Sequence, residues 1–446
     1  MADTAAGLGP RRAALRILEA TGRGRPFDAA RDDAVASLGE RDRRLAHELA
    51  AGVLRRRTEL DAALAPLLPR GLAGVAPRIA DVLRLGAYQL TALDRVPPHA
   101  AVSTSVALAR EAAGARAAGF VNAVLRRVAE RSGAAAGERI PPTDHPDAVP
   151  GDAAEELARR YSHPVWLVRR WLERYGPAGT RALLEWNNTV PPLVIQPARS
   201  DLKHLRRRLA EAGIECEPAP FDAGLVTGRR SPRRLPDYDE GAFFVQDPAH
   251  ALVVRYADVP PGATVLDACA APGGKALALG RRAGVVVAAD ASPVRVRRLA
   301  ENLGRAGRGH EHPVVADAAL PPIRQVDAVL VDAPCLGTGT FARHPDARWK
   351  ASPDALGRLA HTQATLLDRT ADVVRPGGLL VYATCSLEPE ENERQVDRFL
   401  ARHPEFRLAP SATVPAELLT ERGELQILPH RHRMDGAFAA RLRKVA

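Results

Sequence analysis

Residues Asp267-Ala-Cys-Ala-Ala-Pro-Gly-Gly-Lys275 form the stretch that decides the fold of this chain. An apolar run ends at Leu266 and a leucine-rich segment starts at Ala276, so the pattern predicts a strand, a tight turn and a helix. A ligand can approach the backbone of such a turn closely because glycine has no side chain. The stretch is not a phosphate-binding P-loop, because that pattern needs Gly at 269 and Ser or Thr at 276, where this chain has Cys269 and Ala276; no G-x-G-x-x-G fingerprint opens this unit either. An ordinary Gly-Gly turn is the alternative, and the rest of the chain decides between the two.

From residue 246 onward, strand and helix patterns alternate along the chain. This alternation predicts a Rossmann-like, largely parallel sheet with helices on both faces. After the opening unit, the expected strands cover residues 285–289, 313–315, 328–331 and 379–383, and the expected helices cover 294–305, 353–374 and 389–400. Residues 424–428 and 437–442 are expected to close the sheet as an antiparallel pair.

Acids and thiols follow the predicted strands at the edge where such folds bind their ligands. These landmarks are Asp267–Lys275, Asp290, Asp317, Asp332–Cys335 and Thr384–Ser386. Asp290 lies about twenty residues beyond the turn, where an acid accepts hydrogen bonds from a ribose diol. Asp317 could hold an adenine amino group in the same way. A nucleoside cofactor without a pyrophosphate fits this set, and S-adenosylmethionine is such a molecule.

Two cysteines, Cys335 and Cys385, fall just past neighbouring predicted strands. Pro389 is expected just inside a helix start, and a thiol beside a helix N-terminus has its pKa lowered from about 8.5. A thiolate that adds to an electron-poor ring makes the adjacent carbon nucleophilic, which divides one difficult substitution into two easier steps. The alternative for any one buried cysteine is a small hydrophobic residue of the core.

The first third of the chain is basic and helical. Residues 1–135 hold 21 Lys and Arg against 14 Asp and Glu, and the whole chain has a net charge of +10. Apolar stripes at helical spacing over residues 11–130 predict a bundle of six or seven helices. The arginines that flank these stripes, Arg41, Arg43, Arg44, Arg55–Arg57, Arg126 and Arg127, suit phosphate contacts or plain solvated helix faces. The excess favours a nucleic-acid partner.

The composition divides the chain into four parts. We expect a helical domain at 1–135, a Pro- and Gly-containing linker at 136–152, a helical and small α+β subdomain at 153–240, and a catalytic domain at 241–446. The sequence has no apolar run of membrane-spanning length and no signal-peptide pattern, and its four cysteines form no C-x-x-C pair. A cytoplasmic protein without a membrane span or a metal site is therefore expected, with a monomer as the default.

These motifs resemble those of the RNA 5-methylcytosine methyltransferases, within them the bacterial 16S rRNA enzymes of the RsmB type. The resemblance covers nearly the whole chain. It rests on Cys269–Lys275, on Asp332-Ala-Pro-Cys335, on Thr384-Cys385-Ser386 fifty residues later, and on Leu428-Pro429 with Asp435-Gly436. The segment Gly241–Pro248 matches the family's entry to the cofactor turn, and the basic start resembles the RNA-binding domain of antitermination factor NusB.

The resemblance implies a seven-stranded S-adenosylmethionine-dependent methyltransferase domain and a role for each motif residue. Cysteine 385 is implied to attack cytosine C6, Cys335 to assist release of the enzyme, and Asp332 to lie between cofactor and base. Lys275 is implied to contact the base or the cofactor carboxylate. The implied cofactor-binding residues are Cys269, Ala270, Ala271, Pro272, Gly273, Gly274, Lys275, Asp290, Asp317 and Asp332. The closing motif departs from the family at Ala437, where a second aromatic residue is common.

Three other functions remain open at this point. The enzyme could act on another RNA, such as tRNA or 23S rRNA, or the chain could be a non-catalytic RNA-binding assembly factor. The intact turn and Cys385 argue against the second of these. DNA cytosine methylation is a third alternative, which the second thiol and the absence of a target-recognition insertion after Cys335 disfavour. In that class the Pro-Cys thiol is the nucleophile, so spacing alone does not order the two cysteines.

Overall fold

The computed structural model describes residues 7–134, 152–228 and 231–445. The expected linker, 136–152, lies outside the described residues except for Asp152. The chain divides into two compact units, one of residues 1–188 with 344–350 and one of 189–343 with 351–446. No described helix combines the length and the apolar character that a membrane crossing requires.

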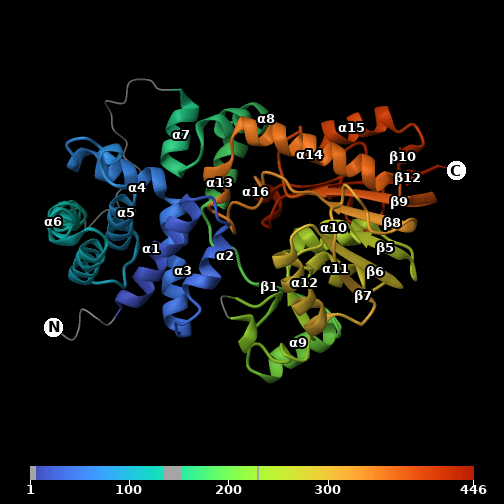
Figure 1. Ribbon diagram of the computed structural model, residues 1–446, viewed down its shortest axis with the longest axis horizontal. Helices are drawn as coiled ribbons and strands as arrows, with labels where there is room; N and C mark the ends of the chain where they lie inside the picture. Colours follow the sequence, from blue (N-terminus) through green and yellow to red (C-terminus); the bar gives the residue numbers. More distant parts are fainter. Residues whose placement is uncertain (1–6, 135–151, 229–230, 446) are drawn as a thin grey trace. The chain divides into compact units, whose positions relative to one another are not determined.

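The first unit is helical, as the apolar periodicity predicts. Its main core is formed by the apolar stripes of the first six helices, with Leu49, Leu83 and Leu125 among the fully buried residues. Long helices α6 and α8 change direction at Gly114 and Gly176, which adopt the positive φ angles that glycine tolerates best. The helices are α1 (Leu8–Gly22), α2 (Phe27–Ala34), α3 (Glu40–Arg55), α4 (Arg57–Leu64), α5 (Pro77–Ala92), α6 (Pro98–Ala134), α7 (Ala153–Tyr161) and α8 (Val165–Asn187) (Figure 1).

A short segment from the second half of the chain completes this helical unit. Helix α13 (Ala347–Lys350) places Arg348 in its interior, where Nη1 donates to the Asn188 side chain at 2.8 Å and Nη2 to the Asn187 carbonyl at 2.8 Å. Burial, and then the charge of Arg55, lower the pKa of Arg348 to about 9. The indole of Trp349 donates to the Leu54 carbonyl. The chain therefore leaves the second unit after Arg343 and returns to it at Ala351.

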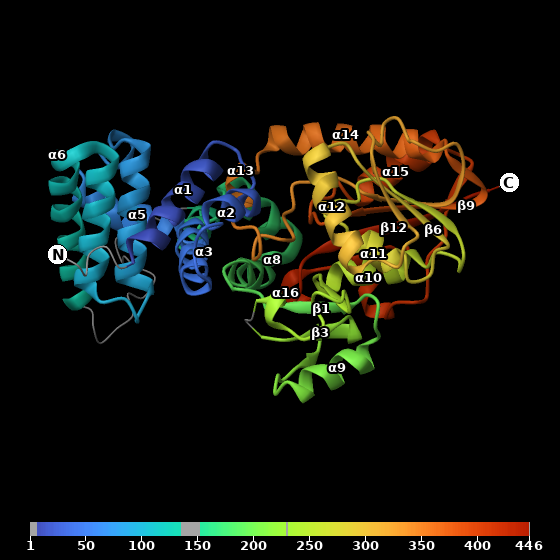
Figure 2. The same ribbon diagram turned by 60° about the horizontal axis from the view of Figure 1, so that its bottom comes forward.

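The second unit begins with a small antiparallel sheet in the order β2-β3-β1-β4. Helix α9 (Leu202–Glu211) covers one face of it (Figure 2), and Leu205 and Leu209 pack against Ile195 and Phe243 in a separate core. The strands are β1 (Val194–Pro197), β2 (Glu217–Pro218), β3 (Leu225–Val226) and β4 (Phe243–Val245).

The rest of the second unit is built on a mixed sheet in the order β10-β12-β9-β8-β5-β6-β7. Strands β5 to β9 are parallel, whereas β12 pairs antiparallel with β9, β10 and β11. The expected antiparallel closing pair is confirmed, with Leu425 opposite Ala439. The sheet has eight strands rather than the seven expected, because β11 pairs with β12 off the main path.

The strands of this sheet are β5 (Thr264–Asp267), β6 (Val285–Asp290), β7 (Glu311–Val315), β8 (Val326–Asp332), β9 (Val374–Thr384), β10 (Phe406–Leu408), β11 (Leu425–Ile427) and β12 (Ala437–Lys444). The helices are α10 (Pro248–Ala257), α11 (Gly274–Leu279), α12 (Pro293–Ala306), α14 (Pro353–Ala371), α15 (Glu393–Arg402) and α16 (Pro429–His432).

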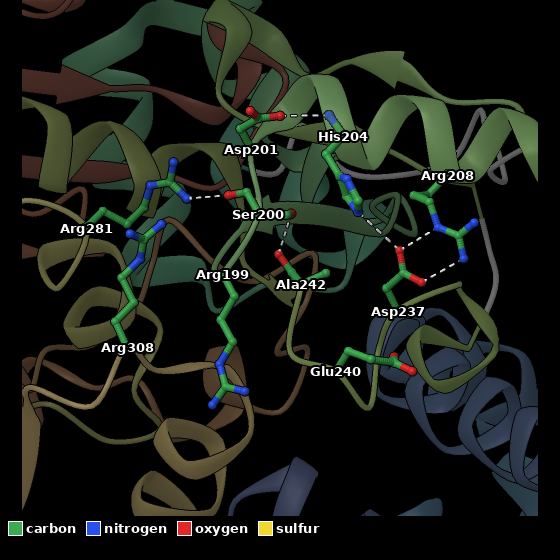
Figure 3. Close-up of a pocket in the computed structure, with 10 residues that line it drawn as sticks. All are labelled: Arg199, Ser200, Asp201, His204, Arg208, Asp237, Glu240, Ala242, Arg281 and Arg308. Carbon is green, nitrogen blue, oxygen red and sulfur yellow. Dashed lines mark hydrogen bonds and ion pairs between the residues drawn. The ribbon is translucent and has the colours of Figure 1, made fainter.

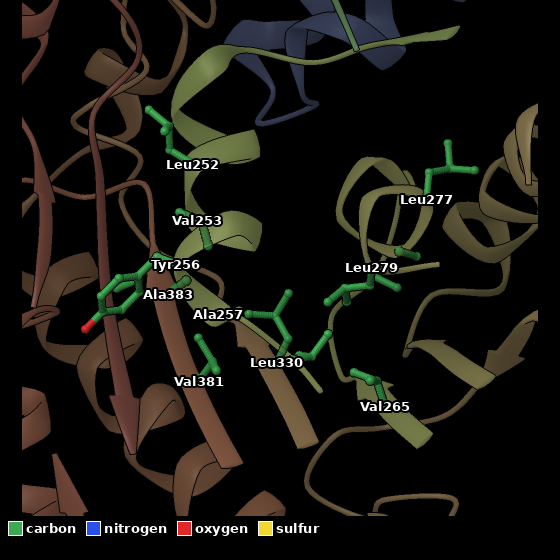
Figure 4. Packing of buried hydrophobic residues seen from close by; sticks show 14 of the residues in the cluster. Leu252, Val253, Tyr256, Ala257, Val265, Leu277, Leu279, Leu330, Val381 and Ala383 are labelled. Carbon is green, nitrogen blue, oxygen red and sulfur yellow. The ribbon is translucent and has the colours of Figure 1, made fainter. Parts of the chain in front are cut away.

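Alternate side chains of the central strands enter two different cores. On β9, Val381 packs with residues of α10 and α11, a core that also receives Val265 and Leu330 (Figure 4). Leu380 and Tyr382 face the opposite way and pack with residues of α14 and α15. Successive side chains of a strand point to opposite faces, so helices on both sides bury nearly every residue of these strands.

Two leucines of the second unit test this packing as a matched pair. Leu380 is fully buried, and Leu320 is 77% exposed. We expect Leu380→Ala to lower the free energy of unfolding of the sheet by about 2–5 kcal/mol, because it removes buried methyl groups and leaves a cavity. Leu320→Ala should change it by about 0.5 kcal/mol or less.

Hydrogen exchange of peptides from β8 and β9 is the appropriate measurement. All four tryptophans, Trp166, Trp171, Trp186 and Trp349, belong to the helical unit, so tryptophan fluorescence would not report on the sheet. Equal losses of protection in the two variants would contradict the assignment of Leu380 to the core.

Candidate active site

The carboxyl ends of four neighbouring strands bring together most of the residues singled out in the sequence. Asp267, Asp290, Asp332 and Thr384 are the last residues of β5, β6, β8 and β9. These strands are parallel and lie in the order β9-β8-β5-β6, so their ends form one continuous edge. The edge at which the sequence predicted an active site therefore holds a cluster of acids, and the two thiols follow just beyond β8 and β9.

The Asp267–Lys275 stretch forms the predicted strand, turn and helix. Gly273 caps α11 with a φ of +112°, and a Cβ atom there would lie 2.9 Å from the Leu299 side chain. The Gly273 amide donates to the Ala270 carbonyl, and the Ala270 amide donates to the Ala289 carbonyl on β6. Glycine at 273 is thus required by backbone conformation and by space.

Asp267 is a buried carboxylate without a well-aligned hydrogen bond to either side-chain oxygen. Burial, followed by the charge of Asp332, raises the pKa of Asp267 to about 7, although Lys275 and the Cys269 amide act in the other direction. An unsatisfied buried carboxylate is costly to a fold. A ligand that brings cationic and hydroxyl donors to this edge would satisfy it, and S-adenosylmethionine carries an ammonium group and a ribose diol.

Asp290 is connected to the turn by Arg295. One Asp290 oxygen accepts from the Ser292 amide, and the other is 3.2 Å from Nη1 of Arg295. Arg295 also donates to the Ala271 carbonyl at 2.6 Å, so it links the acid to the cofactor turn. Asp317 is different: it is exposed, and its carboxylate accepts from the Ala319 amide in its own loop. It lies two residues past β7, and among the described residues it forms no hydrogen bond or ion pair with the rest of this cluster.

Lys275 and Asp332 form an ion pair with a distance of 2.7 Å between Nζ and Oδ2. The ammonium also lies 3.1 Å from Nδ1 of His250, a residue that the sequence pattern did not single out. Burial lowers the pKa of Lys275, but Asp332, the thiolate of Cys385 and Asp267 raise it more, and the net shift is upward. Lys275 thus interacts with Asp332, Asp267 and Cys385.

The sulfur atoms of Cys335 and Cys385 lie 3.2 Å apart. The hydrogen bond to Cys385, and then burial, raise the pKa of Cys335 well above its ordinary value. The loop after Cys335 is fixed from two sides: Gly339 donates to the Cys385 carbonyl, and Gly436 donates to the Gly339 carbonyl. A Cβ atom on Gly436 would lie 2.8 Å from the Gly339 backbone, which explains the glycine of the closing motif.

Three buried carboxylates, Glu391, Asp247 and Asp435, support this arrangement, and the sequence assigned a chemical role to none of them. Glu391 accepts from the Leu336 amide, next to Cys335, and from the Gln363 side chain. Burial is the largest cause that raises the pKa of Glu391. The guanidinium of Arg343 lies between Asp247 and Asp435 and so connects the entry segment to the closing motif.

The prediction that a helix begins beside Cys385 is wrong. Helix α15 begins at Glu393, and residues 389–392 form turns instead. Cys385 therefore lies eight residues before the helix, and the helix cannot supply the charge that was expected to favour a thiolate. Lys275 is the cation that interacts with Cys385.

Replacing Asp267 by asparagine tests the buried charge. In the wild type the pKa of Asp267 is raised, so the carboxyl favours folding when protonated, and this contribution is lost as the pH rises through about 7. We expect Asp267→Asn to stabilise the ligand-free protein at pH 8, by on the order of 1–3 kcal/mol, and much less at pH 5. Calorimetric unfolding at the two pH values measures this difference.

The same variant should bind S-adenosylmethionine more weakly in a calorimetric titration, because a charged acceptor is lost. A gain in stability that is the same at pH 5 and pH 8 would contradict a titrating carboxyl at this position.

Thiol alkylation tests which cysteines are unreactive. Burial, and then the charges of Asp332, Asp267 and Asp290, raise the pKa of Cys269 to about 12. We expect iodoacetamide at pH 8 to modify Cys269 on the order of 10³-fold more slowly than free glutathione, because so little thiolate is present. Peptide mass spectrometry over time gives the rates, and modification of Cys269 at the glutathione rate would refute the assignment.

Comparison with known proteins agrees with this architecture. Family models match three parts of the chain: the NusB family at residues 9–130, the Methyltr_RsmF/B-like ferredoxin-like domain at 163–228, and 16S rRNA methyltransferase RsmB/F at 256–443. The second of these corresponds to the region that contains the first strands of the small antiparallel sheet.

Related proteins and structures extend over the whole chain. The chain is 34% identical to a probable ribosomal RNA small subunit methyltransferase B of Synechocystis, over 91% of this chain and 92% of that protein. It is also 34% identical to ribosomal RNA small subunit methyltransferase B of Vibrio cholerae, over 97% and 96%. A crystal structure of PH0851 superimposes with a TM-score of 0.81 at 25% identity, over 98% of this chain and 99% of that one.

A further solved structure shares the fold. NSun6 from Pyrococcus horikoshii, solved with SFG, superimposes with a TM-score of 0.56 at 19% identity, over 64% of this chain and 98% of that one. The chain is a methyltransferase by its family model, and S-adenosylmethionine is its cofactor. With its relatives aligned over nearly its full length, the chain belongs to the RsmB/F family of 16S rRNA methyltransferases.

Proposed function

We propose that the protein transfers a methyl group from S-adenosylmethionine to C5 of a cytosine in 16S rRNA, through a covalent bond between Cys385 and cytosine C6. The observation that carries this proposal is the pair of thiols 3.2 Å apart at the strand edge that also holds the Lys275–Asp332 ion pair. The names of the relatives support the rRNA substrate.

The proposed reaction starts with attack of the Cys385 thiolate on C6, which forms the S–C6 bond and moves the ring electrons towards C5. Lys275 stabilises the thiolate before attack, since it is the cation that interacts with Cys385. Its ion pair with Asp332 keeps the ammonium in position. When bound, the cofactor would supply an electrophilic methyl group: the C5–CH3 bond would form as the S–CH3 bond breaks, with the sulfonium leaving as a neutral thioether.

Release then requires loss of the C5 proton and cleavage of the S–C6 bond. The electrons of the C5–H bond restore the C5=C6 double bond, and Cys385 leaves as a thiolate. We assign Cys335 to assist this step, because its sulfur contacts the leaving sulfur. Its raised pKa keeps Cys335 protonated, so it can donate its proton to the departing Cys385 sulfur, and the Cys335 thiolate that results can take up the C5 proton. Glu391 holds the loop after Cys335 through the Leu336 amide.

For the cofactor, we propose that residues Cys269 to Lys275 line it, that Asp290 accepts from the ribose hydroxyls and that Asp317 lies near the adenine. Asp332 is assigned to the boundary between cofactor and base. Asp267 is added to this set, because its unsatisfied carboxylate is buried at the start of the same turn. The domain boundaries at 135, 152 and 240, and a cytoplasmic monomeric state, are part of the same proposal.

A trapping assay tests the reaction class and the order of the thiols. Protein, S-adenosylmethionine and a small-subunit rRNA fragment that contains 5-fluorocytosine are combined and run on a denaturing gel. Fluorine does not leave as a proton does, so the covalent adduct should persist. We expect Cys385→Ala to abolish the adduct, and Cys335→Ala to retain it.

Cys216→Ala is the matched control, because Cys216 is a free cysteine that packs beside the core of the small antiparallel sheet. Loss of the adduct in Cys335→Ala alone would invert the two assignments. Equal adduct formation on 23S rRNA or tRNA fragments would refute the 16S specificity.

A further inference from the structure

A groove of about 660 Å³ in the second unit is lined by four arginines, and three of them, from distant parts of the chain, form no ion pair among the described residues (Figure 3). Arg199 follows β1 in the small antiparallel sheet, Arg281 follows α11, and Arg308 lies between α12 and β7. All three are exposed, and in Figure 3 their guanidinium groups lie on the same side of the groove.

Backbone carbonyls fix these arginines without cancelling their charge. Arg281 donates to the carbonyls of Pro197, Ala198 and Ser200. Arg199 donates to the Gly304 and Gly307 carbonyls, and Arg308 donates to the Ala198 carbonyl. Among the described residues, no carboxylate forms an ion pair with any of the three. Burial, and then the charge of Arg308, lower the pKa of Arg281, which shows that the two like charges interact.

The acids on the same groove are engaged elsewhere or lie on the other wall. Asp237 accepts two hydrogen bonds from Arg208, at 2.8 and 2.9 Å. Asp201 caps α9 by accepting from the His204 amide, and its charge partly offsets the lowering of the Arg281 pKa. Glu240 is drawn beside Asp237, away from Arg281. The arginine wall therefore keeps a net positive charge.

The chemistry of this wall matches a chain of phosphates. A guanidinium is planar and presents several donors, so phosphate oxygens bind it in a bidentate manner. The charges of Arg281 and Arg308 repel each other, and a polyanion that lies along them relieves the repulsion. The groove is open to solvent, as a phosphodiester backbone requires.

We propose that the Arg199–Arg281–Arg308 wall binds the sugar–phosphate backbone of the substrate RNA at a site apart from the target base. This inference rests on the proposed function for the identity of the RNA. Arg281 precedes β6 and Arg308 precedes β7, whereas the cofactor and thiol residues follow the ends of the parallel strands. The groove thus lies at the opposite edge of the sheet, on the order of 15–20 Å from the reacting base.

Because of this separation, loss of the wall should affect RNA binding but not the chemical step. The wall would contact nucleotides remote from the reacting cytosine, so it would contribute to RNA affinity and leave the rate of the chemical step unchanged. A long rRNA fragment reaches both sites, and an RNA too short to span the sheet reaches only one.

Adjacent arginines provide a matched pair for the test. Arg281→Gln removes a charge of the wall, and Arg282→Gln removes the charge of a neighbour that is paired with Asp258 and does not line the groove. Binding of a long small-subunit rRNA fragment is measured by fluorescence anisotropy from 50 to 300 mM salt. We expect Arg281→Gln and Arg308→Gln each to weaken binding about 3- to 10-fold and to reduce the slope of log affinity against log salt by about one.

Arg282→Gln should leave that slope unchanged. Methyl transfer to a short RNA should proceed with unchanged kcat in all three variants, whereas KM for the long fragment should rise in Arg281→Gln and Arg308→Gln. If either glutamine variant fails to fold, Arg281→Lys keeps the charge and should retain the salt slope while losing part of the affinity.

An unchanged slope in folded Arg281→Gln and Arg308→Gln overturns the proposal. Unchanged affinity for naked RNA with weaker binding to small-subunit particles would also overturn it, since a ribosomal protein would then be the partner. The two proposals can fail separately. If the adduct is trapped but the wall variants bind RNA normally, only the RNA-binding role of the groove is refuted. If the wall variants change the salt slope but no adduct forms, only the proposed methyl-transfer reaction is refuted.

Discussion

The ion pair between Lys275 and Asp332 is the interaction on which the rest of the site depends. It joins the turn after β5 to the end of β8, and these are neighbouring parallel strands. Lys275 is almost fully buried, and a buried ammonium without a partner would be strongly destabilising. The pair therefore fixes the turn relative to the segment that leads to Cys335. The charge of Cys385 is also among the causes that raise the pKa of Lys275, whereas no helix begins beside Cys385.

A second set of charges holds the outer segments around this centre. Arg343 lies between Asp247, which caps α10, and Asp435, which precedes Gly436. Burial and the neighbouring Asp247 raise the pKa of Asp435 to about 7, against the effect of Arg343. Such a cluster is costly to bury and intolerant of losing one member. The cluster aligns the entry segment, the loop after Cys335 and the closing motif. We therefore infer that it positions these segments rather than adding to the net stability of the fold.

Local patterns predicted most of the elements but few of the contacts. The strand, turn and helix around Gly273 and the stripes of the helical unit follow from periodicity and glycine chemistry, which are local. Helix α15 was expected too early because Pro389 resembles a helix start, yet the buried Glu391 is held in a turn by the Gln363 side chain and the Leu336 amide. The environment of the Asp267 carboxylate and the arginine wall that contains Arg281 are formed by residues far apart in the sequence. A local sequence pattern could therefore not predict them.

The segment of residues 344–350 has a consequence for how this protein can be divided. Its chain passes between the two units three times: after Asn188, after Arg343 and before Ala351. A shortened chain that starts at Thr189 would keep α13 but lose the helices that bury Arg348 and accept the Trp349 hydrogen bond. The helical unit therefore cannot be removed by a single cut in the chain. A catalytic fragment prepared from this chain would have to omit or replace residues 344–350 as well as the helices before Thr189.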